Sequence, residues 1–117
     1  MGTFTQAITL HSADGDYTET LDALVDTGST FTSMPSPVLE RLGIQPHRTV
    51  RLRLANGQLE RRALGDVRAD LDGESQIIIC VFGDADMTPL IGAVTLGTFL
   101  LAADLVSQRL VPVEGYW

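Results

Sequence analysis

Apolar and polar residues alternate along much of this chain with a period of two, as in strands with one buried face. Ile8–His11 and Tyr17–Val25 flank a polar cluster of turn-forming residues, and together they predict a β-hairpin. Val50–Ala55 alternates without a break, and Gln58–Leu64 continues the pattern after Asn56-Gly57. Because Asn-Gly is the strongest short signal for a hairpin turn, a second hairpin is expected here.

The other expected elements are short. Ser36 is a candidate N-cap for a helix over Pro37–Leu42, and Gly43 would end that helix. A second helix is expected over Ala93–Leu101. The remaining segments are a turn near Asp72-Gly73, a strand end at Leu90-Ile91-Gly92, and strands over Ala102–Leu105 and Arg109–Val113. The pattern therefore predicts a mainly β protein with one or two short helices.

Length and composition narrow the class of protein. The chain has 117 residues, so we expect residues 1–117 to form a single domain with an ordinary globular composition. No apolar run approaches the ~20 residues of a membrane span, and the first residues lack the basic and apolar regions of a signal peptide. Cys80 is the one cysteine, and it is expected to be a small core residue of a buried strand. These features favour a cytoplasmic protein with no membrane partner.

Charge is distributed unevenly along the chain. The formal net charge is −7, yet six of the eight arginines fall between positions 48 and 68, with only Glu60 and Asp66 among them. That segment therefore carries +4 and the remainder −11. Nucleic-acid binding is one use of such a segment, but the acidic remainder would repel a phosphate backbone and no aromatic residues interleave with the arginines. A solvated strand face and no nucleic-acid partner are expected.

Metal and nucleotide sites are not expected from the sequence. His11 and His47 have no cluster of cysteine or histidine around them, as a zinc site would require. The segment Gly92–Thr98 has the glycine spacing of a phosphate-binding loop but lacks the lysine of such a loop. The chain is therefore expected to use neither a metal nor a cofactor.

Asp26 is the candidate for chemistry. It stands at the end of the apolar stretch Ala23-Leu24-Val25 and is followed at once by Thr27-Gly28-Ser29. This context predicts a carboxylate at a buried, sharply turned position, which is costly unless the group is paired or hydrogen-bonded. The hydroxyls of Thr27 and Ser29 can supply such bonds, and Gly28 allows a tight turn. The simpler alternative is an ordinary Asx turn between two strands.

The order of three motifs points to a family. The apolar stretch with Asp26-Thr27-Gly28-Ser29, the later Asn56-Gly57 hairpin, and Leu90-Ile91-Gly92 before a helix together resemble the retroviral-type (retropepsin-like) aspartic peptidases, including their single-domain bacterial relatives. The resemblance extends from Thr5 to Val113. It implies a retropepsin-like closed β-barrel or sheet with a flap hairpin, acting as a homodimer. It also implies an aspartic endopeptidase, a hydrolase that acts on peptide or protein substrates without a cofactor.

The resemblance also implies roles for the residues around Asp26. In this family two carboxylates share a proton and activate the water molecule that attacks the peptide bond. Because this chain has one Asp-Thr-Gly, the dyad would consist of Asp26 from each subunit of a homodimer. Thr27 would bond across the dimer, Gly28 would approach the carboxylates, and Ser29 would donate to the outer carboxylate oxygen. Many retroviral members carry alanine at this last place, so Ser29 hints at a more acidic working range.

Two further segments receive roles from the resemblance. Leu90, Ile91 and Gly92 would pack against the turn that carries Asp26. Ala55-Asn56-Gly57-Gln58 would form the flap over an extended peptide, which pairs by main-chain hydrogen bonds. The arginines beside this hairpin would either favour acidic residues in a substrate or keep the open flap soluble.

Two questions stay open at this point. The aromatic end of the chain, Tyr116-Trp117, is either a dimer anchor or a frayed end. The alternative function is a retropepsin-like module for peptide binding or dimerisation, with little or no turnover.

Overall fold

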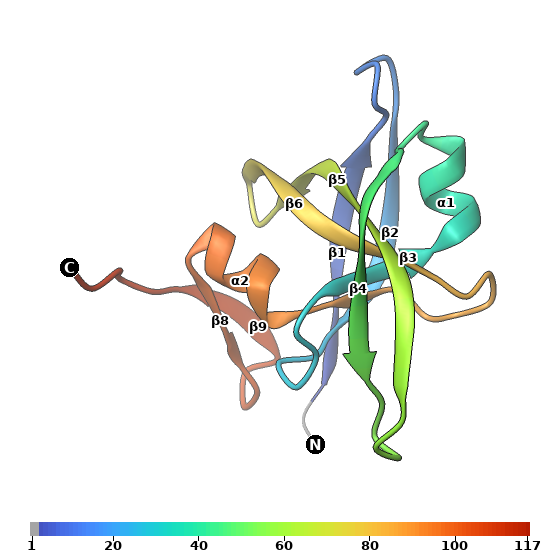
Figure 1. Cartoon of the computed structure of the whole chain (residues 1–117). Coiled ribbons are helices and arrows are strands. Elements are labelled where there is room, and N and C mark those ends of the chain that lie inside the picture. The colour runs from blue at the N-terminus through green and yellow to red at the C-terminus, as the bar shows by residue number, and fades with distance from the viewer. Residues whose placement is uncertain (1–2) are drawn as a thin grey trace.

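The computed structural model of the protein describes residues 3–117, and these residues form nine strands and two short helices (Figure 1). The strands are β1 (Phe4–His11), β2 (Thr18–Val25), β3 (Thr32–Pro35), β4 (Pro46–Arg53), β5 (Leu59–Leu71), β6 (Glu74–Gly83), β7 (Leu90–Ile91), β8 (Leu101–Asp104) and β9 (Arg109–Pro112). The helices are α1 (Ser36–Arg41) and α2 (Ala93–Phe99). The prediction of a mainly β protein with short helices is confirmed.

Six of the strands close into a barrel. The large sheet has the order β1-β2-β7-β3-β6-β5-β4, and β5 also pairs with β1 through Thr9↔Asp70 and Leu10↔Ala69. This additional pairing joins the sheet into a ring and leaves β4 outside it, with β5 as its sheet neighbour. β8 and β9 form a separate two-stranded hairpin beside α2, at one side of the barrel (Figure 1). The expected closed barrel is confirmed.

β5 shows how the period of two builds the barrel interior. Val67, Ala69 and Leu71 are buried, whereas the intervening Asp66 and Arg68 are exposed. Successive side chains of a strand point to opposite faces, so one strand supplies both a core-facing and a solvent-facing row. Each fully buried large apolar side chain contributes about 1.5–3 kcal/mol to the free energy of unfolding.

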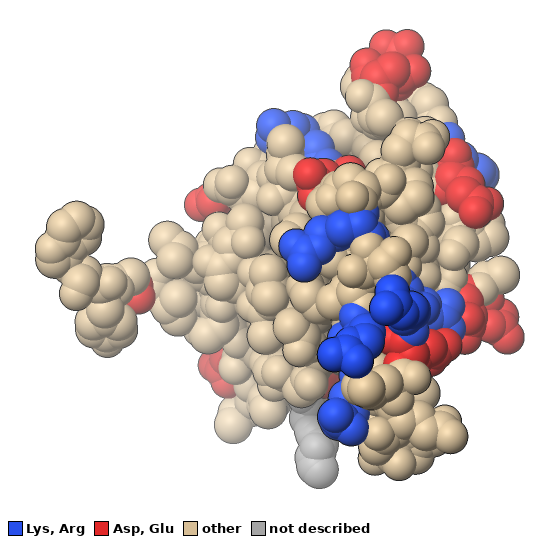
Figure 2. All heavy atoms as spheres, viewed as in Figure 1, with Lys and Arg blue, Asp and Glu red and all other residues tan. Residues whose placement is uncertain are grey.

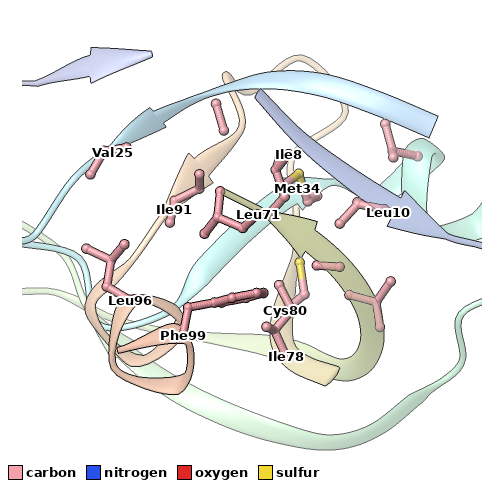
Figure 3. Packing of buried hydrophobic residues seen from close by; sticks show 14 of the residues in the cluster. Ile8, Leu10, Val25, Met34, Leu71, Ile78, Cys80, Ile91, Leu96 and Phe99 are labelled. Atoms are coloured by element: carbon pink, nitrogen blue, oxygen red, sulfur yellow. The ribbon is translucent and has the colours of Figure 1, made fainter. Parts of the chain in front are cut away.

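The hydrophobic core continues from the barrel to the second helix. Phe99 of α2 is 4% exposed and points toward Ile78 and Cys80 of β6 (Figure 3). Leu96, one turn earlier on the same helix, is also buried. This packing fixes α2 against β6 and therefore fixes where the chain that precedes α2 must lie.

The expected capping of α1 by Ser36 is wrong. The N-cap residue is Pro35, and no side chain caps the first turn. The Ser36 hydroxyl instead donates to the Gly83 carbonyl oxygen at 2.6 Å, which joins α1 to the end of β6. Gly43 follows the helix in the left-handed conformation (φ 74°) that ends many helices, as expected. No helix among residues 3–117 is long and apolar enough to cross a membrane.

Several boundaries differ from the expected ones. α2 ends at Phe99 because Leu100 adopts a left-handed conformation (φ 54°), so β8 begins and ends one residue early. β9 begins at Arg109 as expected and ends one residue early. β4 covers Pro46–Arg53 instead of Val50–Ala55, and β5 extends to Leu71 instead of ending at Leu64. The sequence pattern does not predict β3, which has only four residues.

Both expected turns join hairpins, but their geometries differ. Asp72 and Gly73 have positive φ (52° and 84°), as the central residues of a type I′ turn require. In the β4–β5 hairpin, Gly57 has positive φ (86°) and Asn56 does not. The Gly57 amide donates to the Leu54 carbonyl oxygen at 2.9 Å, so the tip is a longer loop that ends in a left-handed glycine.

Cys80 offers a test of this packing. Its side chain is fully buried, and burial raises the pKa of the thiol to about 12. Since the thiolate is the reactive form, we expect the native protein at about pH 8 to resist an aromatic disulfide reagent and the unfolded protein to react fully. The absorbance of the released thiolate measures both rates. Fast labelling of the native protein would contradict the placement of Cys80 in the core.

Candidate active site

Asp26 lies immediately after β2, in a surface turn that we call the Asp26 turn (residues 26–30). Its side chain is half-buried, while Thr27 and Gly28 are exposed. The expectation of a buried carboxylate is therefore wrong for the single chain, because burial stops at Val25, the last residue of β2. The carboxylate is therefore accessible from the surface of the single chain.

Two donors within the turn orient the Asp26 carboxylate. The Gly28 amide donates to Oδ1 at 3.0 Å, and the Ser29 hydroxyl donates to Oδ2 at 3.2 Å. A Cβ atom at position 28 would lie 3.3 Å from Oδ1, so glycine leaves room for this approach. Among residues 3–117, no hydrogen bond to the Thr27 hydroxyl is present, and none joins Asp26 to another carboxyl group. One chain therefore presents one oriented carboxylate.

The short strand β7 holds the turn from its place between β2 and β3 in the barrel wall. Leu90 and Ile91 pair in parallel with the last two residues of β2, and the Asp26 amide donates to the Ile91 carbonyl oxygen at 2.9 Å. Beyond β7, the amides of Ala93 and Val94 donate to the carbonyl oxygens of Ser29 (2.8 Å) and Thr30 (2.9 Å). The first amides of a helix have no partner within it, so the Asp26 turn completes the start of α2.

Gly92 lies between β7 and α2 and touches the turn most closely. A Cβ atom there would lie 2.5 Å from both the carbonyl carbon and the carbonyl oxygen of Phe31, and 2.9 Å from the Ser29 carbonyl oxygen. Its φ of −101° and ψ of 179° suit any residue, so space and not backbone conformation requires glycine. The chain can cross behind the Asp26 turn only because position 92 has no side chain.

Two buried threonines support the same crossing, and neither was predicted from the sequence. Thr32 and Thr95 are 0% and 1% exposed, and their hydroxyl oxygens lie 2.6 Å apart. The Gly92 amide donates to the Thr32 hydroxyl oxygen at 3.1 Å. The two residues are 63 positions apart, in β3 and α2, so no local pattern could have paired them. Thr32 lies among other hydroxyl residues (Ser29-Thr30-Phe31-Thr32-Ser33), so the sequence does not single it out.

A cleft of about 800 Å³ separates the Asp26 turn from β4. Gly28, Ser29 and Thr30 form one side, and Arg51–Ala55 form the other. Of the expected flap residues, Ala55 lines this cleft, whereas 56–58 lie at the hairpin tip outside its lining. Leu90 contributes to the lining beside the turn. The structure thus brings the Asp26 turn, β7 and the β4–β5 hairpin around one hollow.

The histidines lie elsewhere. His11 Nε2 is 2.9 Å from Asp70 Oδ1, and His47 Nε2 is 2.9 Å from Asp66 Oδ1. The hydrogen bond from His11 lowers the pKa of the Asp70 carboxyl group. Within the described chain, no group of three or more metal-ligating side chains is present.

Comparisons with known proteins agree with this geometry. The family model described as aspartyl protease matches residues 11–77, which include Asp26 and the β4–β5 hairpin. No curated protein matches the chain significantly.

Solved structures share the fold. The solution structure of the simian foamy virus protease has a TM-score of 0.58 at 15% identity, covering 81% of this chain and 93% of that chain. The EIAV protease in complex with the inhibitor HBY-793 has a TM-score of 0.55 at 15% identity, covering 81% and 86%. At these identities the likeness shows a common retropepsin-like architecture.

Gly92 and Gly97 form a matched pair of positions for testing the crossing. We expect Gly92→Ala to lower the free energy of unfolding by about 1–3 kcal/mol, because its Cβ atom would meet backbone on two sides. Gly97 lies in α2 with nothing within 4 Å of an added Cβ atom. Gly97→Ala is therefore expected to raise the free energy of unfolding by about 0.5–1 kcal/mol. Urea denaturation measures both, and equal effects of the two changes would contradict the crowding at Gly92.

Proposed function

Because this chain belongs to the aspartyl protease family, we propose that it is an endopeptidase whose catalytic dyad is formed by Asp26 from each of two identical subunits. The single observation that carries this proposal is the oriented carboxylate of Asp26 beside the cleft. Gly28 and Ser29 hold both of its oxygens, yet the turn faces solvent. An ordinary structural aspartate would not need a cleft of this size next to it.

The homodimer follows from the chemistry and from exposed surface. Hydrolysis by this mechanism needs two carboxylates, and the chain contains one Asp-Thr-Gly. A two-fold axis through the Asp26 turn would bring both acids to one point, and the exposed Thr27 hydroxyl would bond across that axis. The C-terminal part of the chain also exposes apolar side chains, among them Val106, Tyr116 and Trp117. Such surface is suited to a contact with a second copy.

The proposed reaction needs no covalent intermediate. The two carboxyl groups share one proton, because two carboxylates a few ångströms apart do not both ionise readily. The ionised Asp26 accepts a proton from a water molecule while the oxygen of that water molecule attacks the peptide carbonyl carbon. The partner's Asp26 donates its proton to the carbonyl oxygen. When the C–N bond of the tetrahedral intermediate breaks, the Asp26 carboxyl group that gained a proton from water gives it to the leaving amine. One hydroxyl of the intermediate returns its proton to the partner's Asp26, so the product is a carboxylic acid and the dyad again holds one proton.

The peptide would enter the cleft as an extended strand. Among the described residues, β4 is the outer strand of the sheet and pairs only with β5. The other edge of its backbone is therefore free to pair with a peptide. The hairpin tip with Ala55 and Gly57 would then act as the flap. The glycine there, already in a left-handed conformation, lets backbone come close to the peptide.

Asp26→Asn is the first test of this proposal. The substitution keeps the size of the side chain but removes the group that accepts the proton from water. We expect cleavage of a diverse peptide library between about pH 3 and pH 7 to fall by at least about 10³-fold, with the circular dichroism spectrum unchanged. Mass spectrometry of the products measures the loss. Cleavage that survives the substitution would exclude the dyad, and no cleavage by the wild type would favour a binding module.

The proposed dimer is tested by measuring specific activity at different protein concentrations. If the dyad forms between subunits, specific activity should rise with protein concentration and level off where light scattering gives twice the mass of the 12.6 kDa chain. Excess Asp26→Asn protein should then suppress the wild-type activity by forming mixed dimers. Constant specific activity from a monomer would contradict the proposal.

Ser29 sets a separate expectation for activity. Its hydroxyl donates to Asp26 Oδ2 and so helps to orient the carboxylate. In Ser29→Ala we expect kcat/KM to fall by about fivefold, which corresponds to the loss of one hydrogen bond of about 1 kcal/mol. Thr30→Ala is the matched control, since Thr30 lies on the same turn and the same cleft without contacting the carboxylate. An equal fall in both variants would show that the hydrogen bond is not the cause.

A further inference from the structure

The arginines of this chain divide into two groups by their contacts. Arg62 lies between Glu60 (2.6 Å) and Asp84 (2.8 Å), and the hydrogen bond from its guanidinium to Asp84 contributes most to the rise of its pKa. Arg41 pairs with Glu19. By contrast, within residues 3–117 no ion pair involves the arginines of the β4–β5 hairpin other than Arg62. The members without an ion pair are Arg48, Arg51, Arg53, Arg61 and Arg68.

Two of the unpaired arginines face the candidate active site. Arg51 and Arg53 line the cleft beside the Asp26 turn, and no other charged residue lines it. Arg53 is partly engaged, because its Nη1 donates to the Gly57 carbonyl oxygen at 2.9 Å. Figure 2 shows blue side chains gathered over β4 and β5 on a chain whose formal charge is −7. The cleft is therefore a positive hollow in an acidic protein.

The register of the hairpin makes this arrangement unfavourable in the free chain. Arg51 pairs directly with Arg61 across the two strands, so two like charges occupy one face at the closest cross-strand distance. Such a pair destabilises a sheet unless an anion joins it. The neighbouring pair, Leu52↔Glu60, shows that an acidic residue is present one position away, yet on the opposite face. The guanidinium of Arg51 is thus available to pair with an anionic group of another molecule.

We propose that the cleft selects extended peptides with a glutamate or aspartate side chain placed against Arg51, with Arg53 as a secondary contact. This inference rests on the proposed peptidase function and adds the substrate class. A peptide paired with the free edge of β4 would send alternate side chains toward the same face as Arg51. A guanidinium there can hold a carboxylate by two parallel hydrogen bonds, an arrangement that an amide of the same shape cannot replace.

Peptide pairs that differ by one atom test this preference. We would use decapeptides with a central pair of leucines and with Glu or Gln in turn at each flanking position. Binding is measured by fluorescence anisotropy to the Asp26→Asn protein, which cannot turn the peptide over, and cleavage is measured separately with the wild type. We expect the Glu peptide to bind about fivefold more tightly at one flanking position. The preference should shrink at about 0.5 M salt.

Arg51→Gln and Arg48→Gln form the matched pair of variants. Both remove one unpaired charge from β4, but only Arg51 lines the cleft. We expect Arg51→Gln to bring the Glu/Gln binding ratio close to one and Arg48→Gln to leave it nearly unchanged. Loss of repulsion with Arg61 means that Arg51→Gln should fold at least as well as the wild type. Equal losses in both variants would overturn a specific contact and indicate diffuse attraction.

The outcomes separate this inference from the proposed function. Cleavage by the wild type without any Glu preference overturns the inference and leaves the peptidase in place. A Glu preference in binding that depends on Arg51, without cleavage by the wild type, supports the acidic ligand and overturns the peptidase. Absence of both binding and cleavage overturns both.

Discussion

The geometry around Asp26 depends on how closely Gly92 approaches the backbone of Phe31. Because position 92 has no Cβ atom, β7 can pass between β2 and β3 and lead directly into α2. That path brings the amides of Ala93 and Val94 to the carbonyl groups of the Asp26 turn. The turn is thus fixed by backbone hydrogen bonds at both of its ends, and its carboxylate is oriented without help from long side chains. A site built on such short, rigid connections keeps its geometry under thermal motion better than one built on flexible loops.

The half-exposed position of Asp26 is consistent with a site completed by a second molecule. In the single chain the carboxylate stays hydrated, so its charge costs little. Covering it would remove that hydration, and the two donors from Gly28 and Ser29 would then replace part of the lost water. The donors are already in place before any such burial. The turn is therefore prepared for a drier environment than the one it has in the isolated chain.

Local patterns could predict most of the fold but not its long-range contacts. The alternation in Val50–Ala55 and the Asp72-Gly73 turn depend on neighbours in the sequence, so both hairpins were predictable. Ser36 has the residue type and position of a cap, yet its hydroxyl meets the Gly83 carbonyl oxygen, which comes 47 positions later. The Thr32–Thr95 contact is equally remote. At the site, the motif around Asp26 was visible in the sequence, whereas the exposure of its turn depends on where β2 leaves the barrel.

One long strand belongs both to the closed ring and to the hairpin beside the cleft. The C-terminal half of β5 lies in the barrel, where it pairs with β6 from Leu64 to Leu71 and with β1 near Ala69. Its N-terminal half, from Leu59 to Ala63, has β4 as its ladder partner. A two-stranded hairpin is only marginally stable by itself, so opening there costs less free energy than opening anywhere in the closed ring. The same strand that closes the barrel through β1 thus carries a hairpin beside the cleft whose opening would leave the closed ring intact.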